Sequence, residues 1–256
     1  MHHHPGILLP GSSFARHPLP KSESHAAIPR IQFPKKPLVS TPTQSQITKD
    51  NRITPQLLAI LVSPRGDYSV STAFTHIFVD AWKQNYQGPV VLRDLNTTEL
   101  PFVSLPWIAG SYTPAEQHSP EMTAALKISN ELIAELKAAD HIVIGTPMYN
   151  FTTPAILKAY IDQIVRLNET FNASYQGLVH GKKVTILIAS GGDFSEGSQM
   201  AAYNVESGHL KQVFGFIGIT DVNVVLTGGT SGIDQSKTSR EAFMAQFTPA
   251  VVAAAK

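Results

Sequence analysis

The chain has 256 residues, of which 43% are apolar and 15% charged, a composition typical of a globular protein and too apolar for a wholly disordered one. It contains no cysteine, which excludes disulfides, thiolate metal sites and a cysteine nucleophile. The net charge of +1 is the sum of two unlike parts, because residues 1–55 carry +5 and residues 56–256 carry −4.

Residues 1–52 are basic and rich in proline. The prolines recur every few positions, and each removes a backbone donor and disfavours helix in the residue before it. We therefore expect residues 1–52 to be a disordered, Pro- and His-rich extension and residues 53–256 to form one domain. The three histidines at positions 2–4 do not by themselves predict a metal site, and the apolar run at residues 7–9 is too short for a signal peptide.

The globular part opens with an apolar run at residues 57–62, which is typical of a strand buried on both faces. A turn-rich loop follows, and Ser69 begins a helical pattern with one apolar face. A Gly-Pro pair ends that helix, and residues 90–92 predict a second strand. Residues 96–115 show no apolar periodicity, so we expect a long irregular loop there, of the kind that often forms a lid or binding loop.

The rest of the chain continues to alternate between helical patterns and short apolar runs. We expect a helix through residues 125–136, a strand at 141–144 that ends at 145–147, a helix that starts with Thr153 as N-cap and Pro154 as first residue, a strand at 184–189, a helix through Leu210 and Val213, a strand at 222–226 and a final helix at about 236–254.

This order predicts an α/β fold with a doubly wound, five-stranded parallel sheet and helices on both of its faces. Ligands of such sheets bind beyond the carboxyl ends of the strands, so the residues that follow each strand are the informative ones. No apolar run approaches the ~20 residues needed to span a bilayer. We expect neither a membrane nor a nucleic-acid partner.

The loop after the first strand supplies hydroxyl groups and the N-terminus of a helix, in the residues Ser63, Ser69, Val70 and Ser71. Unpaired helix amides and the helix dipole both favour an anion, so this loop predicts a phosphate site. It is neither a Walker A loop nor a GxGxxG motif. Ser69 taken singly is better explained as an ordinary N-cap.

Two further loops follow the third and fourth strands. Residues 148–151, Met-Tyr-Asn-Phe, offer aromatic surface and one amide, which suit the face and edge of a flat heteroaromatic ring, although core packing remains an alternative for the aromatic residues. Ser190 is followed by Gly191 and Gly192, whose backbone could approach a ligand closely or could form an ordinary turn.

No Ser/His/Asp order, paired carboxylates or metal-binding motif accompanies these loops, so we predict no protein catalytic residue and no metal site. His141 begins a strand, where a structural role is expected. The predicted site can hold an anion and a planar ring but offers little for acid–base chemistry. This pattern is typical of a protein whose cofactor carries the reactivity.

Three strings make the chain similar to a known family. The first runs from Ser129 into Pro147-Met148-Tyr149-Asn150-Phe151. The second consists of Gly177-Leu178-Val179 together with Gly181-Lys182-Lys183, and the third is Gly215-Phe216-Ile217-Gly218-Ile219-Thr220-Asp221. From about Leu57 to its end the chain resembles the FMN-dependent NADH-azoreductases of the flavodoxin-like quinone reductase group. Residues 1–52 lie outside the resemblance.

The resemblance implies a flavodoxin-like fold, a cytoplasmic homodimer and one FMN per subunit near the dimer interface. It places Ser63, Ser69, Val70 and Ser71 at the FMN phosphate, Met148, Tyr149, Asn150 and Phe151 along the isoalloxazine ring, Ser190, Gly191 and Gly192 at its pyrimidine side, and Phe171 over the substrate space.

The implied reaction is ping-pong transfer of hydride from NADH or NADPH through flavin N5 to a quinone or an azo compound. The chain departs from the family pattern on the substrate side. It lacks the Arg often found between Ser190 and Gly191, it lacks a His near Phe194, and its loop between Phe171 and Gly177 is shorter.

Two other hypotheses remain open from the sequence. One is a flavodoxin-like electron carrier that has no NADH-dependent turnover of its own. The other is that the basic extension tethers the enzyme to an acidic surface.

Overall fold

The computed structural model describes residues 54–256, so the extension expected at residues 1–52 and the predicted domain start at Ile53 lie outside the described residues. Five strands form one sheet in which every neighbouring pair is parallel, in the order β2-β1-β3-β4-β5. They are β1 (Leu57–Leu61), β2 (Val90–Asp94), β3 (His141–Pro147), β4 (Lys183–Ser190) and β5 (Asp221–Gly228). This strand order is that of the flavodoxin-like doubly wound fold, which the sequence predicts.

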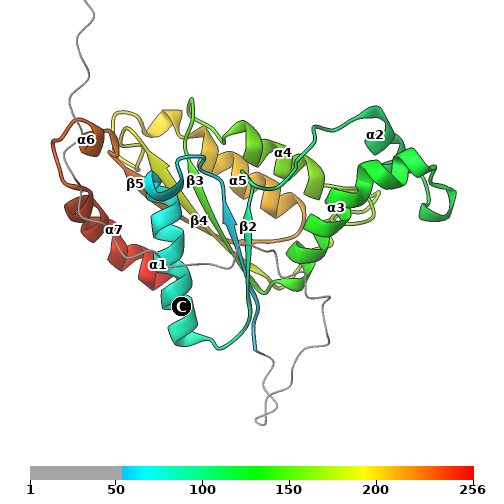
Figure 1. Cartoon of the computed structure of the whole chain (residues 1–256), viewed down its shortest axis with the longest axis horizontal. Helices are drawn as coiled ribbons and strands as arrows, with labels where there is room; N and C mark the ends of the chain where they lie inside the picture. The colour runs from blue at the N-terminus through cyan, green and yellow to red at the C-terminus, as the bar shows by residue number, and fades with distance from the viewer. Residues whose placement is uncertain (1–53) are drawn as a thin grey trace, which may run out of the picture. The chain divides into compact units, whose positions relative to one another are not determined.

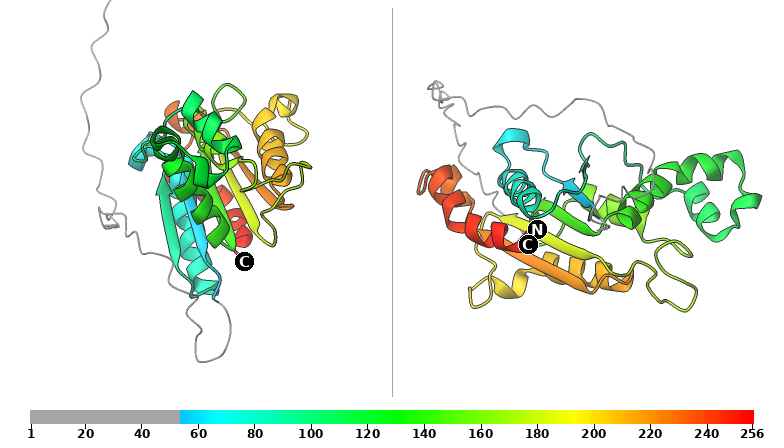
Figure 2. Two further views of the ribbon diagram at one scale, coloured as in Figure 1. Left: turned by 90° about the vertical axis from the view of Figure 1, so that its right-hand side faces the viewer. Right: turned by 90° about the horizontal axis from the view of Figure 1, so that it is seen from below.

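Helices cover both faces of this sheet, as Figures 1 and 2 show. Those on one face are α1 (Val70–Asn85) and α7 (Arg240–Ala254), and those on the other are α3 (Pro120–Ala138), α4 (Ala155–Ile164) and α5 (Val205–Phe216). Two shorter helices, α2 (Leu105–Tyr112) and α6 (Ser231–Asp234), lie in connecting segments. No helix in residues 54–256 is long and apolar enough to cross a membrane.

The alternation of side chains along the strands divides the core into two clusters. On β1, Leu57 and Ala59 pack with α1 and α7, while Leu58 and Ile60 pack with α3, α4 and α5. All four are fully buried. Burial on both faces explains why this strand is a continuous apolar run.

Gly145 lets α1 approach the sheet closely. A Cβ atom at this position would lie 2.0 Å from the Thr75 Oγ1 atom and 2.8 Å from the Ser71 carbonyl oxygen. Only a residue without a side chain therefore fits β3 at this point. The close packing fixes the first turn of α1 beside the end of β3.

Three sequence predictions differ from the structure in their details. Residues 96–115 are not irregular throughout, because α2 forms within them, with Ser104 as its N-cap and Pro106 in its first turn. Pro154, not Thr153, occupies the N-cap position of α4. The predicted final helix begins at Arg240 rather than at about Ser236, with Ser239 as its N-cap, and a separate short helix, α6, precedes it.

The missed helix α2 has a physical explanation. Its hydrophobic residues do not form one inward face: Trp107 is buried, whereas Leu105 and Tyr112 are more than 70% exposed. A periodicity test looks for one buried stripe and does not find it here. The Ser104 cap and the early proline were the available signals.

Candidate functional site

The loops predicted to bind a ligand follow β1, β3 and β4, three adjacent strands whose carboxyl ends lie at one edge of the sheet. The chain leaves β1 toward β2 on one side and returns to β3 on the other, which makes this edge the topological switch point. The structure therefore brings three of the four predicted groups of site residues to one edge.

The first loop contains a capped helix N-terminus. The Ser69 hydroxyl accepts a hydrogen bond from the Thr72 amide at 3.1 Å and lies 3.2 Å from the Ser71 hydroxyl. Ser63, Ser69, Val70 and Ser71 are all buried. The amides of Val70 and Ser71 begin α1, where a helix provides them with no partner of its own. These donors and the helix dipole fit an anion.

Two arginines that sequence analysis did not single out stand beside this loop. The Arg240 guanidinium donates to the carbonyl oxygens of Tyr68 at 2.9 Å and Ser69 at 3.0 Å. Arg65, within the loop, pairs with Asp234 at 3.3 Å between exposed side chains. Burial and the charge of Arg65 both lower the pKa of Arg240, so the two guanidinium groups are close enough to repel each other. Their combined positive charge supports an anionic ligand.

The second loop is a tight turn that follows β3. Tyr149 and Thr152 exchange two backbone hydrogen bonds, of 3.0 and 3.1 Å, around Asn150 and Phe151. Both central residues have left-handed backbone conformations, with φ of 49° and 73°. Such a turn is normally made with glycine, so its non-glycine residues require support from their surroundings.

The side chains of this turn face solvent and other aromatic rings. Tyr149 is 41% exposed and Phe151 is 43% exposed, whereas Met148 is buried. The Phe151 ring lies 5.5 Å from the ring of Tyr203 and 6.1 Å from that of Phe194. The apolar surface is thus present and accessible, as contact with a planar ring requires.

A buried carboxyl lies behind the turn. Glu206, in the first turn of α5, is fully buried, and its Oε1 atom lies 3.1 Å from the Thr146 hydroxyl. The Glu206 amide donates to the Phe151 carbonyl oxygen at 3.1 Å. Burial raises the pKa of Glu206 to about 8, against a smaller lowering by the Thr146 hydrogen bond. Sequence analysis missed this residue because nothing local relates it to the turn.

In the third loop, backbone carbonyl groups accept hydrogen bonds from the segment that follows β5. The Ser190 carbonyl accepts from the Gly229 and Thr230 amides, and the Gly191 carbonyl accepts from the Ser231 amide and hydroxyl. Gly191 and Gly192 are exposed. Within residues 54–256 their own amides donate to no protein acceptor, so these donors are available to a ligand.

Phe171 does not join these loops within one chain. Its ring contacts those of Phe216, at 5.0 Å, and Tyr175, at 6.4 Å in a stacked arrangement. Phe216 ends α5 just before β5 begins, so this aromatic cluster lies near the amino-terminal edge of the sheet. The predicted binding loops lie at the opposite edge.

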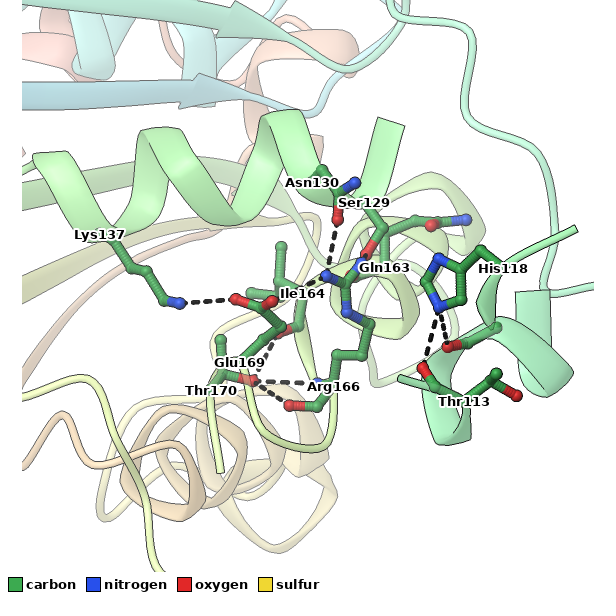
Figure 3. Close-up of polar contacts among 11 residues, drawn as sticks. Thr113, His118, Ser129, Asn130, Lys137, Gln163, Ile164, Arg166, Glu169 and Thr170 are labelled. Carbon is green, nitrogen blue, oxygen red and sulfur yellow. Dashed lines mark hydrogen bonds and ion pairs between the residues drawn. The ribbon is translucent and has the colours of Figure 1, made fainter. Parts of the chain in front are cut away.

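The loop that presents Phe171 is built on Arg166, as Figure 3 shows. The buried Arg166 guanidinium donates to the Ser129 hydroxyl at 2.9 Å and to the Asn130 side-chain oxygen at 2.6 Å, both on α3. It also pairs with Glu169 at 3.2 Å, which in turn pairs with Lys137 at 2.7 Å. This network ties the loop to α3 and fixes where it presents Phe171.

His141 lies at the start of β3, away from the binding loops. It is buried, its Nε2 atom lies 3.1 Å from the Thr185 hydroxyl, and its ring meets that of Phe78 edge-on. Burial, helped by the charge of Lys183, lowers the pKa of His141 to about 4. The residue is therefore neutral near pH 7 and has the structural role that the sequence predicts.

Comparisons with known proteins place this chain in a family. A family model described as flavodoxin-like fold matches residues 55–249. An FMN-dependent NADH:quinone oxidoreductase of Burkholderia lata is 44% identical over 194 residues, covering 75% of this chain and 92% of that protein. A protein of the same description from Jannaschia sp. is 45% identical over 203 residues, covering 79% of this chain and 100% of that protein.

The chain belongs to the family of FMN-dependent NADH:quinone oxidoreductases. Among solved structures, an azoreductase from Bacillus anthracis is similar with a TM-score of 0.69 at 26% identity, covering 78% of this chain and 98% of that one. The resemblance drawn from the Met148–Phe151 and Gly215–Asp221 strings is thereby confirmed. The protein is an enzyme, an oxidoreductase of this family.

Proposed function

We propose that the protein is an FMN-dependent NAD(P)H oxidoreductase that reduces quinones and azo compounds. The observation that carries this proposal is the juxtaposition of two loops at the switch point of the sheet. One offers a helix N-terminus flanked by Arg65 and Arg240, and the other offers the aromatic turn at Met148–Phe151. A ligand that joins a phosphate to a planar ring system fits both the anion-binding helix N-terminus and the aromatic turn.

The residues of the first loop fit the phosphate end of FMN. The hydroxyls of Ser63, Ser69 and Ser71 and the amides of Val70 and Ser71 supply donors at the N-terminus of α1. A helix N-terminus stabilises an anion through its unpaired amides and its dipole. The nearby arginine charge supports the same ligand.

The other two loops fit the isoalloxazine ring. Met148, Tyr149, Asn150 and Phe151 supply apolar surface and one amide. Gly191 and Gly192 supply backbone amides that bind no acceptor within residues 54–256, and the Ser190 hydroxyl, which donates to the Gly192 carbonyl, holds this loop in shape. Such donors, aimed at a heterocycle edge, hold it in place and stabilise negative charge on it.

Bound FMN would supply the hydride chemistry, which the protein side chains do not. We assign no catalytic residue, because no paired carboxylates or Ser/His/Asp arrangement lies among the three loops. The chain binds and orients the ring and keeps water from one of its faces. If NADH and the acceptor occupy the remaining face in turn, the kinetics are ping-pong.

The test is NADH-dependent turnover by protein loaded with FMN. Rates are measured with a benzoquinone and with methyl red as acceptors, with NADH and NADPH as donors, and with apoprotein as the control. The proposal predicts turnover only after FMN is added, with parallel double-reciprocal plots. Protein that binds FMN but is not reduced by NADH would instead be an electron carrier.

We propose a homodimer, supported by exposed apolar side chains. Phe102, Leu105 and Tyr112 around α2 are each more than 70% exposed, as is Tyr175 beside Phe171. Exposed apolar clusters of this kind mark interaction surfaces. In a dimer, Phe171 could cover the substrate space of the second subunit rather than of its own. Analytical ultracentrifugation tests this, and a monomer at micromolar concentration would contradict it.

The proposed compartment is the cytoplasm, where NADH serves as a general reductant. Fractionation of the source cells tests this expectation. Recovery of the protein outside the cytoplasmic fraction would contradict it.

A further inference from the structure

Glu206 is a buried acid that the proposed chemistry does not use. It is fully buried in the first turn of α5, directly behind the turn that would contact the flavin ring. Within residues 54–256, its only side-chain hydrogen bond joins Oε1 to the Thr146 hydroxyl, and its Oε2 atom has no partner. A buried carboxylate with one donor is costly, so a proton on this group is expected from its surroundings.

The hydrogen-bond geometry around Thr146 supports that proton independently. The Thr146 Oγ1 atom lies 3.1 Å from Glu206 Oε1 and 3.2 Å from the Pro147 carbonyl oxygen. A hydroxyl has one proton to donate, so it cannot satisfy both acceptors. A protonated Glu206 resolves the conflict, because it donates to Thr146 while Thr146 donates to Pro147.

Few charges act on Glu206 from the elements that surround it. From β3 its carboxyl faces the uncharged Thr146 hydroxyl, and its backbone amide donates to the Phe151 carbonyl of the turn. On α5 the nearest titratable group in sequence is His209, and the helix N-terminus itself favours the anion. Burial outweighs these effects, in agreement with a pKa raised to about 8.

The turn in front of Glu206 depends on support from outside itself. Asn150 and Phe151 hold left-handed conformations, with φ of 49° and 73°, that non-glycine residues adopt at an energetic cost. The Met148 amide bonds to Ala189, and the Glu206 amide bonds to Phe151. Glu206 thus contacts the turn through its backbone and the strand that precedes the turn through its side chain.

We infer that Glu206 is a positioning residue, which holds the Met148–Phe151 turn in its flavin-binding conformation only while its carboxyl is protonated. Ionisation places a negative charge in the buried space behind the turn and takes the Thr146 hydroxyl from Pro147. The turn then moves or admits water, and flavin binding weakens. The inference rests on the proposed function, because it concerns the same FMN site.

The experiment compares FMN affinity of the wild type and the Glu206→Gln variant between pH 6.5 and 9, followed by quenching of FMN fluorescence. Glutamine keeps the shape of the acid and is neutral throughout. We expect the wild-type Kd to rise about tenfold between pH 7 and pH 9, and that of the variant to change less than twofold. Ionisation of FMN itself affects both proteins equally and cancels in the comparison.

Glu196→Gln is the matched control, because Glu196 is an exposed acid in the loop after β4. It should follow the wild-type profile. Infrared spectra of the wild type should also show a protonated carboxyl band at neutral pH that is absent from Glu206→Gln. This second measurement needs only the folded apoprotein.

The outcomes separate the two proposals. Absence of FMN binding by the wild type at pH 6.5 would overturn the proposed function. Tight binding at pH 6.5 with identical pH profiles for wild type and Glu206→Gln would overturn the role of Glu206 and leave the FMN site standing. Absence of the carboxyl band would overturn it as well.

Discussion

Two loops at the same edge of the sheet are built in different ways. The loop at Ser69–Ser71 contains its own helix cap, because Ser69 caps the helix that begins one residue later, and Arg240 of α7 adds hydrogen bonds to the Tyr68 and Ser69 carbonyls. The turn at Asn150–Phe151 depends on residues far along the chain, since Glu206 lies more than 50 positions away. Both loops would bind the same ligand.

The two loops therefore differ in whether the residues proposed to bind FMN also hold the loop in its conformation. In the first loop the capping residue, Ser69, is itself one of the proposed phosphate ligands. In the second, the residues proposed to contact the ring are bound by Glu206 of α5, a buried residue that is not among them. Substitutions in the first loop should therefore act directly on affinity, whereas those in the second should act through backbone conformation.

The largest expected effect is from Ser69→Asp. Aspartate caps a helix about as well as serine, so α1 should remain folded. Its charge would stand beside the FMN phosphate, where two like charges about 4 Å apart repel by about 4 kcal/mol at an intermediate dielectric. FMN affinity, measured by fluorescence titration, should fall by about 100-fold or more.

Ser104→Asp is the control for that substitution. Ser104 is also an N-cap, on α2, and no phosphate is expected near it. Its FMN affinity should match that of the wild type. Equal losses in both variants, or none in Ser69→Asp, would contradict the phosphate assignment.

The next effect is a pH-dependent change in stability at Glu206. Its pKa is about 8 in the folded protein and near 4.5 when unfolded, so the folded state binds the extra proton between these values. The stabilising effect of this proton is complete below pH 4.5 and is lost as pH rises to 8. Relative to Glu206→Gln, the wild-type apoprotein should lose about 1.4 kcal/mol per pH unit between pH 5 and 7.

Urea unfolding of both apoproteins at pH 5, 6 and 7 measures this difference. Because neither protein contains FMN in this experiment, the result is independent of flavin binding. A constant difference across the three pH values would show that Glu206 is ionised in the folded protein.

Arg240→Gln should have an intermediate effect. It removes a charge beside the first loop and the hydrogen bonds to the carbonyls of Tyr68 and Ser69. The lost charge weakens the attraction for the phosphate, and we expect FMN affinity to fall about tenfold, which corresponds to about 1.4 kcal/mol. The affinity should also become less sensitive to salt.

Lys158→Gln provides the comparison, because Lys158 pairs with Asp162 on the exposed side of α4. It removes the same charge away from the site and should leave the affinity unchanged. Salt dependence that is the same in Arg240→Gln and the wild type would contradict the electrostatic role of Arg240.

The smallest effect concerns the backbone of the second loop. At Asn150, with φ of 49°, glycine is tolerated and alanine is not, so the apoprotein with Asn150→Ala should be about 1 kcal/mol less stable than that with Asn150→Gly. At Ala124, within α3, glycine should instead be the less stable residue. If urea unfolding gave alanine and glycine the same order of stability at both positions, the proposed strain at Asn150 would be contradicted.

The sequence predicts the parts of this molecule that depend on local patterns. The buried strands, the Ser69 cap and the loops that follow the strands all follow from periodicity and capping residues. The helix at α2 was missed because its apolar residues face both the protein and solvent. The residues that support the site, Arg240 and Glu206, belong to distant elements, and only the folded chain relates them to the loops.

The central claim is that these loops form one FMN site, and a crystal structure of the protein reconstituted with FMN tests it most directly. We expect the phosphate within hydrogen-bond distance of Ser69 or Ser71, and the ring against Met148–Phe151 and Gly191–Gly192. An FMN molecule bound elsewhere on the chain, or one whose phosphate lies away from the start of α1, would contradict it.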